Sequence, residues 1–330
     1  MDAADATLVP SYRHLPGNHC GSTALRNLLA HHGVRISEEM ALGLGAGACF
    51  YYVPLDGQSP SRFINGRTAR LEELFVELTG LPLELATFEG QEDSWAAARS
   101  TVDSGRPALL LTDLFYLDHY GSSAHFPGHA VVLAGYDAQV ALLSDTAFEG
   151  LQTTRLEQLA KARHSRHPAY PLDGHMLSIP ETAEPSDPRH AAARAVASAA
   201  GRMLEPPLGE YEGLPALRRF ATEVGEWPNQ VEDWSWCARF AYQVIERRGT
   251  GGGNFRLMYS RFLAECGREE ASLAAEAAAR WTVLAEALRA ASEPERPETA
   301  LWERVSEGSK RVLEAEERLW SSLATAALND

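Results

Sequence analysis

His19-Cys20-Gly21-Ser22-Thr23-Ala24-Leu25-Arg26-Asn27-Leu28-Leu29-Ala30 is the stretch that decides the fold of this chain. Pro16-Gly17 interrupts the backbone just before it, and apolar residues at helical spacing predict a helix over 22–32. We therefore expect Cys20 at a helix N-terminus, where the partial positive charge of the helix end favours thiolate over thiol. Because the thiolate is the nucleophile, the stretch predicts a reactive cysteine.

A second segment, Phe126-Pro127-Gly128-His129 followed by Ala-Val-Val-Leu-Ala-Gly-Tyr-Asp, supplies a histidine at the start of a strand. The apolar run predicts a buried strand over 130–135, and Gly135-Tyr136-Asp137 predicts the turn after it. A second short strand is expected over 140–144, ending at Ser144-Asp145-Thr146. Two antiparallel strands joined by this turn would bring His129 and Asp145 to the same end of a sheet.

Cys20, His129 and Asp145, in this order, are the parts of a nucleophilic apparatus. His129 would take the thiol proton and later protonate the leaving group, and Asp145 would orient the imidazole. Each residue also has a structural interpretation: a small buried thiol, a core histidine, and an Asp that caps a turn. Asp137 competes with Asp145 for the orienting role, but in the hairpin turn its side chain is expected to point away.

Length and composition narrow the class of protein. A chain of 330 residues is long enough for two domains. Its start has no signal-peptide pattern and no apolar run has membrane-spanning length, so we expect a cytoplasmic protein without membrane contact. Cys20, Cys49, Cys237 and Cys266 form no CxxC pair and are expected to be reduced thiols. The net charge of −15 argues against nucleic-acid binding.

A proline-rich polar segment over 180–188 predicts a linker and divides the chain into domains 1–183 and 184–330. The first domain has an α+β pattern. Its helices are expected at 22–32, 68–79, 95–102 and 156–162, and its strands at 108–112, 130–135, 140–144 and 176–179. The second domain is expected to be helical, at 190–204, 214–224, 234–247, 256–266, 268–292 and 298–327.

Several short motifs together resemble a known family. In chain order they are His19-Cys20, Ser37-Glu38-Glu39, Leu42 to Gly47, Phe50-Tyr51-Tyr52, Asn65-Gly66-Arg67, Gly105-Arg106-Pro107, Asp113 to Tyr120, His125 to His129, and Leu159 to Arg163. The segment 12–180 resembles the butirosin biosynthesis protein H family, a branch of papain-like cysteine proteins of the bacteriocin-leader peptidase type. The glycine-rich stretch 249–256 resembles the helical domain usually fused to it. The resemblance implies a papain-like fold, a helix plus an antiparallel half-barrel, followed by an all-α domain.

The resemblance also implies acyl transfer, as in aminoglycoside side-chain assembly. An acyl group held as a thioester on the phosphopantetheine arm of an acyl carrier protein would pass to Cys20 and then to an amine, giving an amide. The enzyme would need no cofactor of its own, because phosphopantetheine arrives with the carrier protein. Its expected partners are a carrier-bound thioester and a small-molecule amine in antibiotic or other specialised metabolite biosynthesis.

Candidate binding residues are less sharply defined. The Cys20 backbone N–H is one expected oxyanion donor, and since the upstream glutamine of papain-like relatives is absent, Asn18 and His19 are the candidates for the second. The candidates for substrate contact are Tyr51, Tyr52, Tyr116, Tyr120, Arg256 and Tyr259.

Metal and nucleotide sites are not expected. His125 and His129 are four residues apart, but Pro127-Gly128 between them argues against a helix that would align them, and no zinc ligand set is complete. The glycine-rich stretches 43–47 and 249–253 do not follow a strand in a phosphate-binding pattern.

Two surfaces could bind other proteins. A basic cluster could receive an acidic carrier protein or be an ordinary solvated helix face; it comprises Arg155, Lys161, Arg163, His164, Arg166 and His167. The two long terminal helices could pair between subunits of a homodimer.

Other function classes stay open. A peptidase or thioesterase could use the same three residues, and a cyclase would result if the amine were the far end of the acyl chain. A non-catalytic scaffold that binds a carrier protein is the third class. The helical domain, in place of the transporter to which leader peptidases are often fused, argues against a peptidase, and the Cys-His-Asp order argues against a scaffold.

Overall fold

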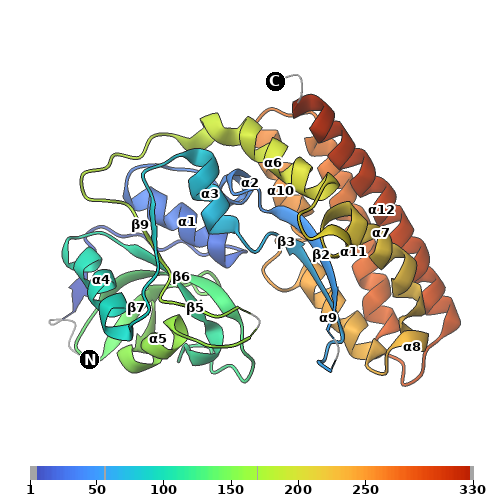
Figure 1. Ribbon diagram of the computed structural model, residues 1–330, viewed down its shortest axis with the longest axis horizontal. Coiled ribbons are helices and arrows are strands. Elements are labelled where there is room, and N and C mark those ends of the chain that lie inside the picture. The colour runs from blue at the N-terminus through green and yellow to red at the C-terminus, as the bar shows by residue number, and fades with distance from the viewer. Residues whose placement is uncertain (1–5, 56, 169, 328–330) are drawn as a thin grey trace. The chain divides into compact units, whose positions relative to one another are not determined.

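A computed structural model of the chain describes residues 6–55, 57–168 and 170–327 (Figure 1). The chain forms two compact units. The first contains 1–41 and 79–188, and the second contains 42–78 and 189–330.

The first unit is built on an antiparallel sheet of seven strands in the order β4-β9-β5-β6-β7-β8, with β1 paired to β6. The strands are β1 (Thr7–Leu8), β4 (Glu84–Ala86), β5 (Ala108–Asp113), β6 (Pro127–Tyr136), β7 (Val140–Ser144), β8 (Gln152–Arg155) and β9 (Met176–Ser178). The helices are α1 (Cys20–His31), α4 (Gln91–Asp103) and α5 (Leu156–Arg163), with short 3-10 turns η1 (Leu114–Tyr116) and η2 (Pro188–Ala191), the latter at the boundary. This α+β unit confirms the predicted fold class.

The strongest sequence signal, the apolar run after His129, forms the centre of the sheet. Strand β6 pairs with β5 on one side and with β7 on the other, and its residues from His129 to Gly135 are buried. Helix α1 packs against β6 (Figure 1). A core cluster of the sheet, in which Val131 and Leu133 of β6 meet Leu110 of β5 and Leu143 of β7, is completed by buried residues of α4 and α5.

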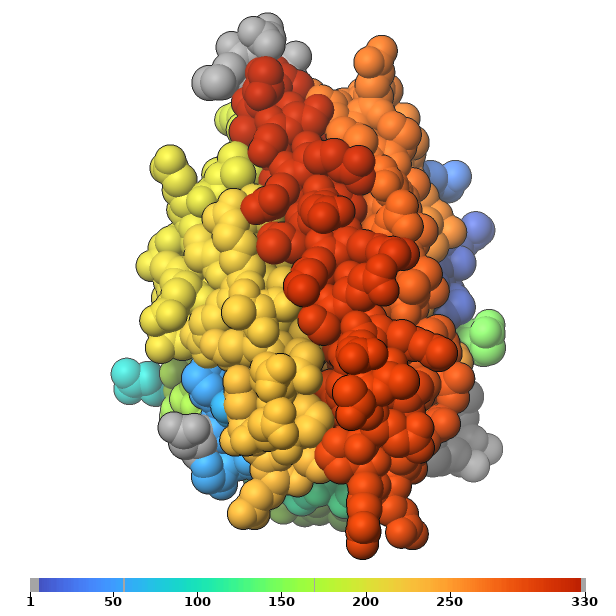
Figure 2. Space-filling view, turned by 90° about the vertical axis from the view of Figure 1, so that its right-hand side faces the viewer, coloured from blue at the N-terminus to red at the C-terminus, as the bar shows by residue number. Residues whose placement is uncertain are grey.

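The second unit is mainly helical. Its helices are α3 (Leu71–Thr79), α6 (Ala192–Leu204), α7 (Gly213–Glu223), α8 (Trp227–Gln230), α9 (Trp234–Glu246), α10 (Arg256–Glu265), α11 (Ala271–Ala291) and α12 (Thr299–Ala327). Short 3-10 turns are η3 (Gly209–Tyr211) and η4 (Val224–Glu226), and α2 (Glu38–Leu44) crosses the boundary between the units. Helix α12 packs against α11 on one side and against α6 and α7 on the other (Figure 2).

The second unit also contains a hairpin, which the predicted boundary had assigned to the first domain. Strands β2 (Ala48–Pro54) and β3 (Arg62–Arg67) pair with each other and not with the main sheet. The ring of Phe50 lies 5.6 Å from that of Phe220 and 5.3 Å from that of Trp281. The predicted domain 1–183 is therefore corrected, because 42–78 buries its aromatic side chains among the C-terminal helices.

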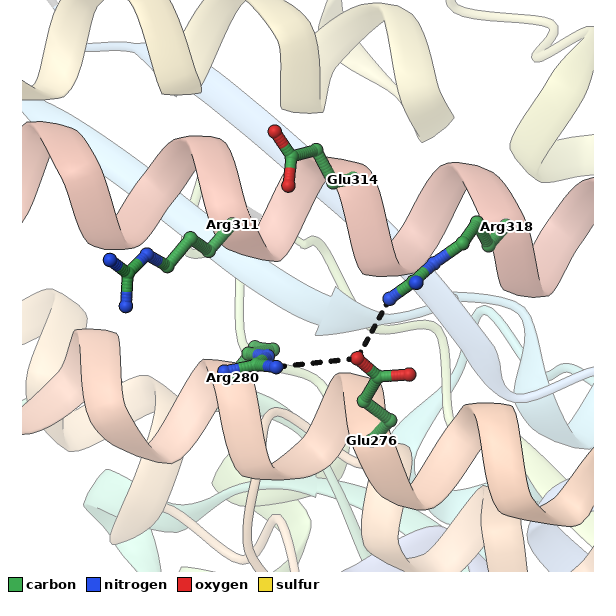
Figure 3. Close-up of a pocket in the computed structure, with 5 residues that line it drawn as sticks. All are labelled: Glu276, Arg280, Arg311, Glu314 and Arg318. Atoms are coloured by element: carbon green, nitrogen blue, oxygen red, sulfur yellow. Dashed lines mark hydrogen bonds and ion pairs between the residues drawn. The ribbon is translucent and has the colours of Figure 1, made fainter.

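A surface depression of about 270 Å³ lies between α11 and α12 (Figure 3). It is lined by Glu276, Arg280, Arg311, Glu314 and Arg318. Glu276 accepts hydrogen bonds from Arg280 and Arg318, so the lining is a network of exposed ion pairs. Such pairs contribute about 0–1 kcal/mol each. Among the described residues, no helix combines the length and the apolar character needed to cross a membrane.

Candidate active site

The loop that leads to Cys20 is held by a buried carboxylate. Glu38, at the start of α2, accepts hydrogen bonds from the backbone N–H groups of Asn18, at 2.9 Å, and of His19, at 2.7 Å. Gly17 passes so close that a Cβ there would lie 2.1 Å from the Thr23 Oγ1 and 2.7 Å from the Glu38 Oε2. Only glycine fits this position, which explains the Pro-Gly break in the sequence.

The same loop is also bonded to the end of β7. The Gly17 N–H donates to the Thr146 carbonyl at 3.1 Å, one residue after Asp145. The His14 Nδ1 lies 2.7 Å from the Ser144 Oγ. These two bonds bring the start of α1 beside the end of β7, although the two segments are more than a hundred residues apart in sequence.

Cys20 is the first residue of α1, as predicted from the sequence. His19 is the N-cap, and its Nδ1 accepts the Ser22 N–H at 3.3 Å. The Cys20 thiol is half-buried and is not in a disulfide. A thiol in this position experiences the positive end of the helix dipole and can still be reached by a substrate.

The structure brings Cys20, His129 and Asp145 together. The His129 Nε2 lies 2.9 Å from the Asp145 Oδ2, and both residues are buried. The side chains of Cys20 and His129 interact electrostatically, and each shifts the pKa of the other. Because Nε2 is engaged by Asp145, the nitrogen available to the thiol is Nδ1.

The electrostatics favour a thiolate and an imidazolium. Burial alone would raise the pKa of the Cys20 thiol, but interactions with His19 and His129 lower this pKa well below its usual range. Burial alone would lower the pKa of His129, but the Asp145 carboxylate and the interaction with Cys20 raise it to about 10. Burial would raise the pKa of Asp145, and the two histidines bonded to it hold that pKa low instead. The proton therefore resides on His129 and the negative charge on Cys20.

Asp145 has two further partners. The His119 Nε2 lies 3.0 Å from its Oδ2, and the Tyr120 hydroxyl donates to its Oδ1 at 3.0 Å. The ring of Tyr120 also stands perpendicular to that of His129, with the centroids 5.5 Å apart. Tyr120, expected to contact substrate, thus has its hydroxyl committed to Asp145.

Asp137 does not take the orienting role. Its carboxylate accepts the backbone N–H groups of Gln139, at 2.7 Å, and of Val140, at 2.8 Å, so it caps the hairpin turn between β6 and β7. This is the arrangement expected from its position in the turn.

The two candidate oxyanion residues both lie next to the thiol in sequence. The Asn18 Nδ2 donates to the Glu38 Oε2 at 3.2 Å, while the Asn18 side chain remains exposed. The His19 Nδ1 accepts the Ser22 N–H at 3.3 Å, and His19 lowers the pKa of the Cys20 thiol. Their part in an oxyanion hole stays a prediction.

Three of the expected substrate contacts are wrong, because their side chains are buried in the second unit. Arg256 is fully buried and forms a bidentate ion pair with Glu316, at 2.8 and 3.0 Å. Tyr52 donates to the Glu223 carboxylate at 2.7 Å, and Tyr259 packs its ring against Trp320 at 5.4 Å. These side chains stabilise the core of the unit and have no surface to offer a substrate.

The remaining two candidates are half-buried. Tyr51, in the second unit, donates its hydroxyl to the buried Glu212 at 2.9 Å. Tyr116, in the first unit, contacts the rings of Phe115 and His125 and packs against the core of the sheet. Whether either contacts a substrate stays a prediction.

The basic cluster is not one continuous cationic surface. Arg163 is buried and donates to the carbonyls of Ser94 and Gly174. Arg155 forms an ion pair with Asp118 at 3.0 Å, and Arg166 forms one with Asp173. The cluster therefore offers an acidic partner less free charge than its sequence indicates.

Sequence reasoning missed Glu38 and the bond between His119 and Asp145 as parts of the site. Glu38 lies in the motif that follows the predicted helix, but nothing in its spacing shows that it folds back onto Asn18 and His19. His119 is followed by Tyr120 in a polar aromatic pair after a buried strand, and this pair was the signal that could have indicated a role beside Asp145.

Two family models match this chain. Residues 19–146 match the family model described as butirosin biosynthesis protein H, N-terminal, and residues 157–323 match one described as a domain of unknown function, DUF4872. Comparison with curated proteins gives no match. Among solved structures, the chain is similar to one titled a C39-like peptidase from Bacillus anthracis, with 16% identity and a TM-score of 0.39, over 54% of this chain and 99% of that one.

The first family model covers Cys20, His129 and Asp145, and the second covers half of the chain. The chain therefore belongs to the family of proteins that carry the DUF4872 domain, with a region before that domain that matches the butirosin biosynthesis protein H N-terminal model.

Proposed function

We propose that this protein transfers an acyl group from a carrier-protein thioester to an amine, through an acyl-enzyme on Cys20. The observation that carries the proposal is the Cys20 thiol at the N-terminus of α1, whose pKa His19 and His129 lower, together with the 2.9 Å contact between the His129 Nε2 and the Asp145 Oδ2. The match of residues 19–146 to the butirosin biosynthesis protein H model supports transfer in a biosynthetic pathway.

The first half-reaction would form the acyl-enzyme. The Cys20 thiolate attacks the thioester carbonyl, and the C–S bond to the phosphopantetheine sulfur breaks. The departing thiolate takes the proton from the His129 imidazolium, leaving the imidazole neutral. The Cys20 backbone N–H and a side chain of the Asn18-His19 pair are the proposed donors to the oxyanion.

The second half-reaction would release the product. A neutral amine attacks the acyl carbonyl and gives its proton to the His129 Nδ1, and Cys20 leaves as thiolate. The products are an amide and the starting thiolate–imidazolium pair, so the cycle needs no cofactor beyond the phosphopantetheine of the substrate. Water in place of the amine would make the same site a thioesterase.

Intact-protein mass spectrometry after incubation with an acyl-pantetheine thioester tests the first half-reaction. The expected result is a mass gain of one acyl group in the wild type and in Cys266→Ala, and no gain in Cys20→Ala. Cys266 is a matched control because it is also half-buried, but burial raises its thiol pKa. An adduct that survives in Cys20→Ala would contradict the assignment of the nucleophile.

The second half-reaction is tested by adding a primary amine to the isolated acyl-enzyme. Faster loss of the acyl group with amine than with buffer alone, together with recovery of the amide, supports a transferase. Loss at the same rate with free acid as the product would identify a hydrolase, and a cyclic product formed without added amine would identify a cyclase.

A further inference from the structure

The carboxylate of Asp145 has more partners than an orienting residue needs for one histidine. Its Oδ2 is shared by the His129 Nε2, at 2.9 Å, and the His119 Nε2, at 3.0 Å. Its Oδ1 accepts the Tyr120 hydroxyl at 3.0 Å. Asp145 is fully buried, so these three donors replace the water that a carboxylate would otherwise bind.

The donors His119 and Tyr120 belong to one short segment that is itself anchored to β8. The Asp118 Oδ2 accepts the Arg155 backbone N–H at 2.8 Å, and the His119 Nδ1 lies 3.1 Å from the Thr154 Oγ1. Thr154 is buried, as is the side chain of His119. The segment 118–120 therefore connects the end of β8 to the carboxylate beside the candidate nucleophile.

The two ring nitrogens of His119 have different partners. The Nδ1 contacts the Thr154 hydroxyl, and the proton on Nε2 is donated to Asp145. Such a chain from Thr154 through His119 restrains the rotation of the Asp145 carboxylate. The restraint matters because the His129 Nδ1 faces Cys20 only while its Nε2 is held by Oδ2.

We propose that His119 is a positioning residue for the acyl-transfer site: its Nε2–H fixes the Asp145 carboxylate, which in turn fixes His129 against Cys20. The inference rests on the proposed function, in which the thiolate–imidazolium pair is the reactive state. Without His119, the carboxylate can rotate away from His129, and the imidazolium loses its anionic partner.

The consequence is a change in the titration of Cys20. The charged and titratable groups around the pair are Asp145, Tyr120, His119 and His19. Losing one hydrogen bond to a buried charged group is worth about one pKa unit at Asp145, and the effect reaches the thiol only through His129, so the thiolate should form at a pH higher by up to about one unit. At a pH below the wild-type midpoint, alkylation of Cys20 would then slow by up to about tenfold.

The test is the rate of Cys20 alkylation by iodoacetamide as a function of pH, measured by peptide mass spectrometry on the full chain. His119→Phe removes the donor and keeps an aromatic ring beside Tyr120 and Phe148, which the His119 ring contacts at 4.9 and 5.2 Å. His119→Gln is the matched variant, since its side-chain amide can still donate to Asp145. We expect the midpoint to rise in His119→Phe and to stay at the wild-type value in His119→Gln.

Three results would overturn the proposal. The alkylation midpoint could stay unchanged in His119→Phe, or it could change equally in both variants. It could also shift to lower pH, which would mean that His119 only withdraws charge from Asp145. If His119→Phe does not fold, Thr154→Val decides instead. This substitution removes the hydroxyl that orients the His119 ring and should raise the pH midpoint of Cys20 alkylation. A midpoint in Thr154→Val equal to that of the wild type would overturn the proposal. Alkylation needs no acyl donor, so failure of acyl transfer in the wild type would be seen separately.

Discussion

The Cys20 thiol and the His129 imidazole share one proton, and their pKa values move in opposite directions. The thiol pKa lies well below its usual range, and the imidazole pKa is raised to about 10. Between these two values the pair is a thiolate and an imidazolium. Both charged forms are needed: the thiolate attacks, and the imidazolium protonates the leaving sulfur.

The rate of acylation should fall at low pH, where Cys20 is protonated, and at high pH, where His129 is deprotonated. The rate is expected to fall on the acid side only as the pH drops through the depressed Cys20 pKa, far below the value of about 8.5 for a free thiol. On the alkaline side it should fall as the pH rises through about 10, where His129 loses its proton. The measurement is the rate of mass gain with a pantetheine thioester from acid to alkaline pH.

The control for this profile is His129→Ala, in which the thiol loses one of the two histidines that lower its pKa. Its alkylation midpoint should move up toward that of a free thiol. A wild-type midpoint already near 8.5 would contradict the ion pair.

At the residue scale, the sequence was informative where a residue lies at the end of an element. Cys20 precedes a helical pattern, and His129 and Asp145 flank two strands, so short patterns located all three. No comparable short sequence pattern indicates that a polar residue will be buried. Arg256 and Tyr259 follow a glycine-rich turn and resemble exposed contacts, but Glu316 and Trp320, some sixty residues later, enclose them.

At the element scale, the position of α1 depends on the loop before it, and Glu38 is the main anchor of that loop. Its buried carboxylate accepts both backbone N–H groups of Asn18 and His19, and the Ser22 hydroxyl at 3.3 Å. Because backbone donors cannot rotate away, loss of the acceptor leaves them unsatisfied.

Glu38→Gln should therefore weaken both the fold and the site. Replacing the charged acceptor costs about 1.5–3 kcal/mol of stability, since hydrogen bonds to charged groups are the stronger ones. Urea unfolding measures this loss, and the acylation rate should fall because the Asn18-His19 turn no longer holds the start of α1. Glu92→Gln, at an exposed position in α4, is the control and should change neither quantity. Unchanged stability in Glu38→Gln would show that the loop is held by other contacts.

Most elements could be predicted because their periodicity is strong. Helix α1 was expected over 22–32 and spans Cys20–His31, and β7 was expected over 140–144 and spans Val140–Ser144. The hairpin of β2 and β3 was not predicted. Phe50 and Tyr52 face aromatic residues more than 150 positions away, so local sequence does not reveal their partners.

At the scale of the whole molecule, the second unit is discontinuous in sequence, and this makes a cut at the linker harmful. Residues 189–330 contain nearly all of its helices but lack the hairpin, which buries Phe50 and Tyr52. Arg256 would also lose its acceptors, the carbonyls of Cys49 and Gly66 at 2.7 and 2.8 Å. Truncating one buried aromatic side chain costs about 3–5 kcal/mol, so losing two removes most of a domain's usual 5–15 kcal/mol.

We therefore expect a fragment of residues 189–330 to lack a cooperative thermal transition by circular dichroism and to aggregate on size exclusion. The matched control is a chain in which a long flexible Gly/Ser linker replaces residues 79–188, so that 42–78 and 189–330 are both present. It should unfold cooperatively, because every residue that fills the core around Phe50 is restored. Cooperative unfolding of the 189–330 fragment, at the same temperature as the linked chain, would contradict this prediction. The hairpin would then be an addition to a helical core that is already complete.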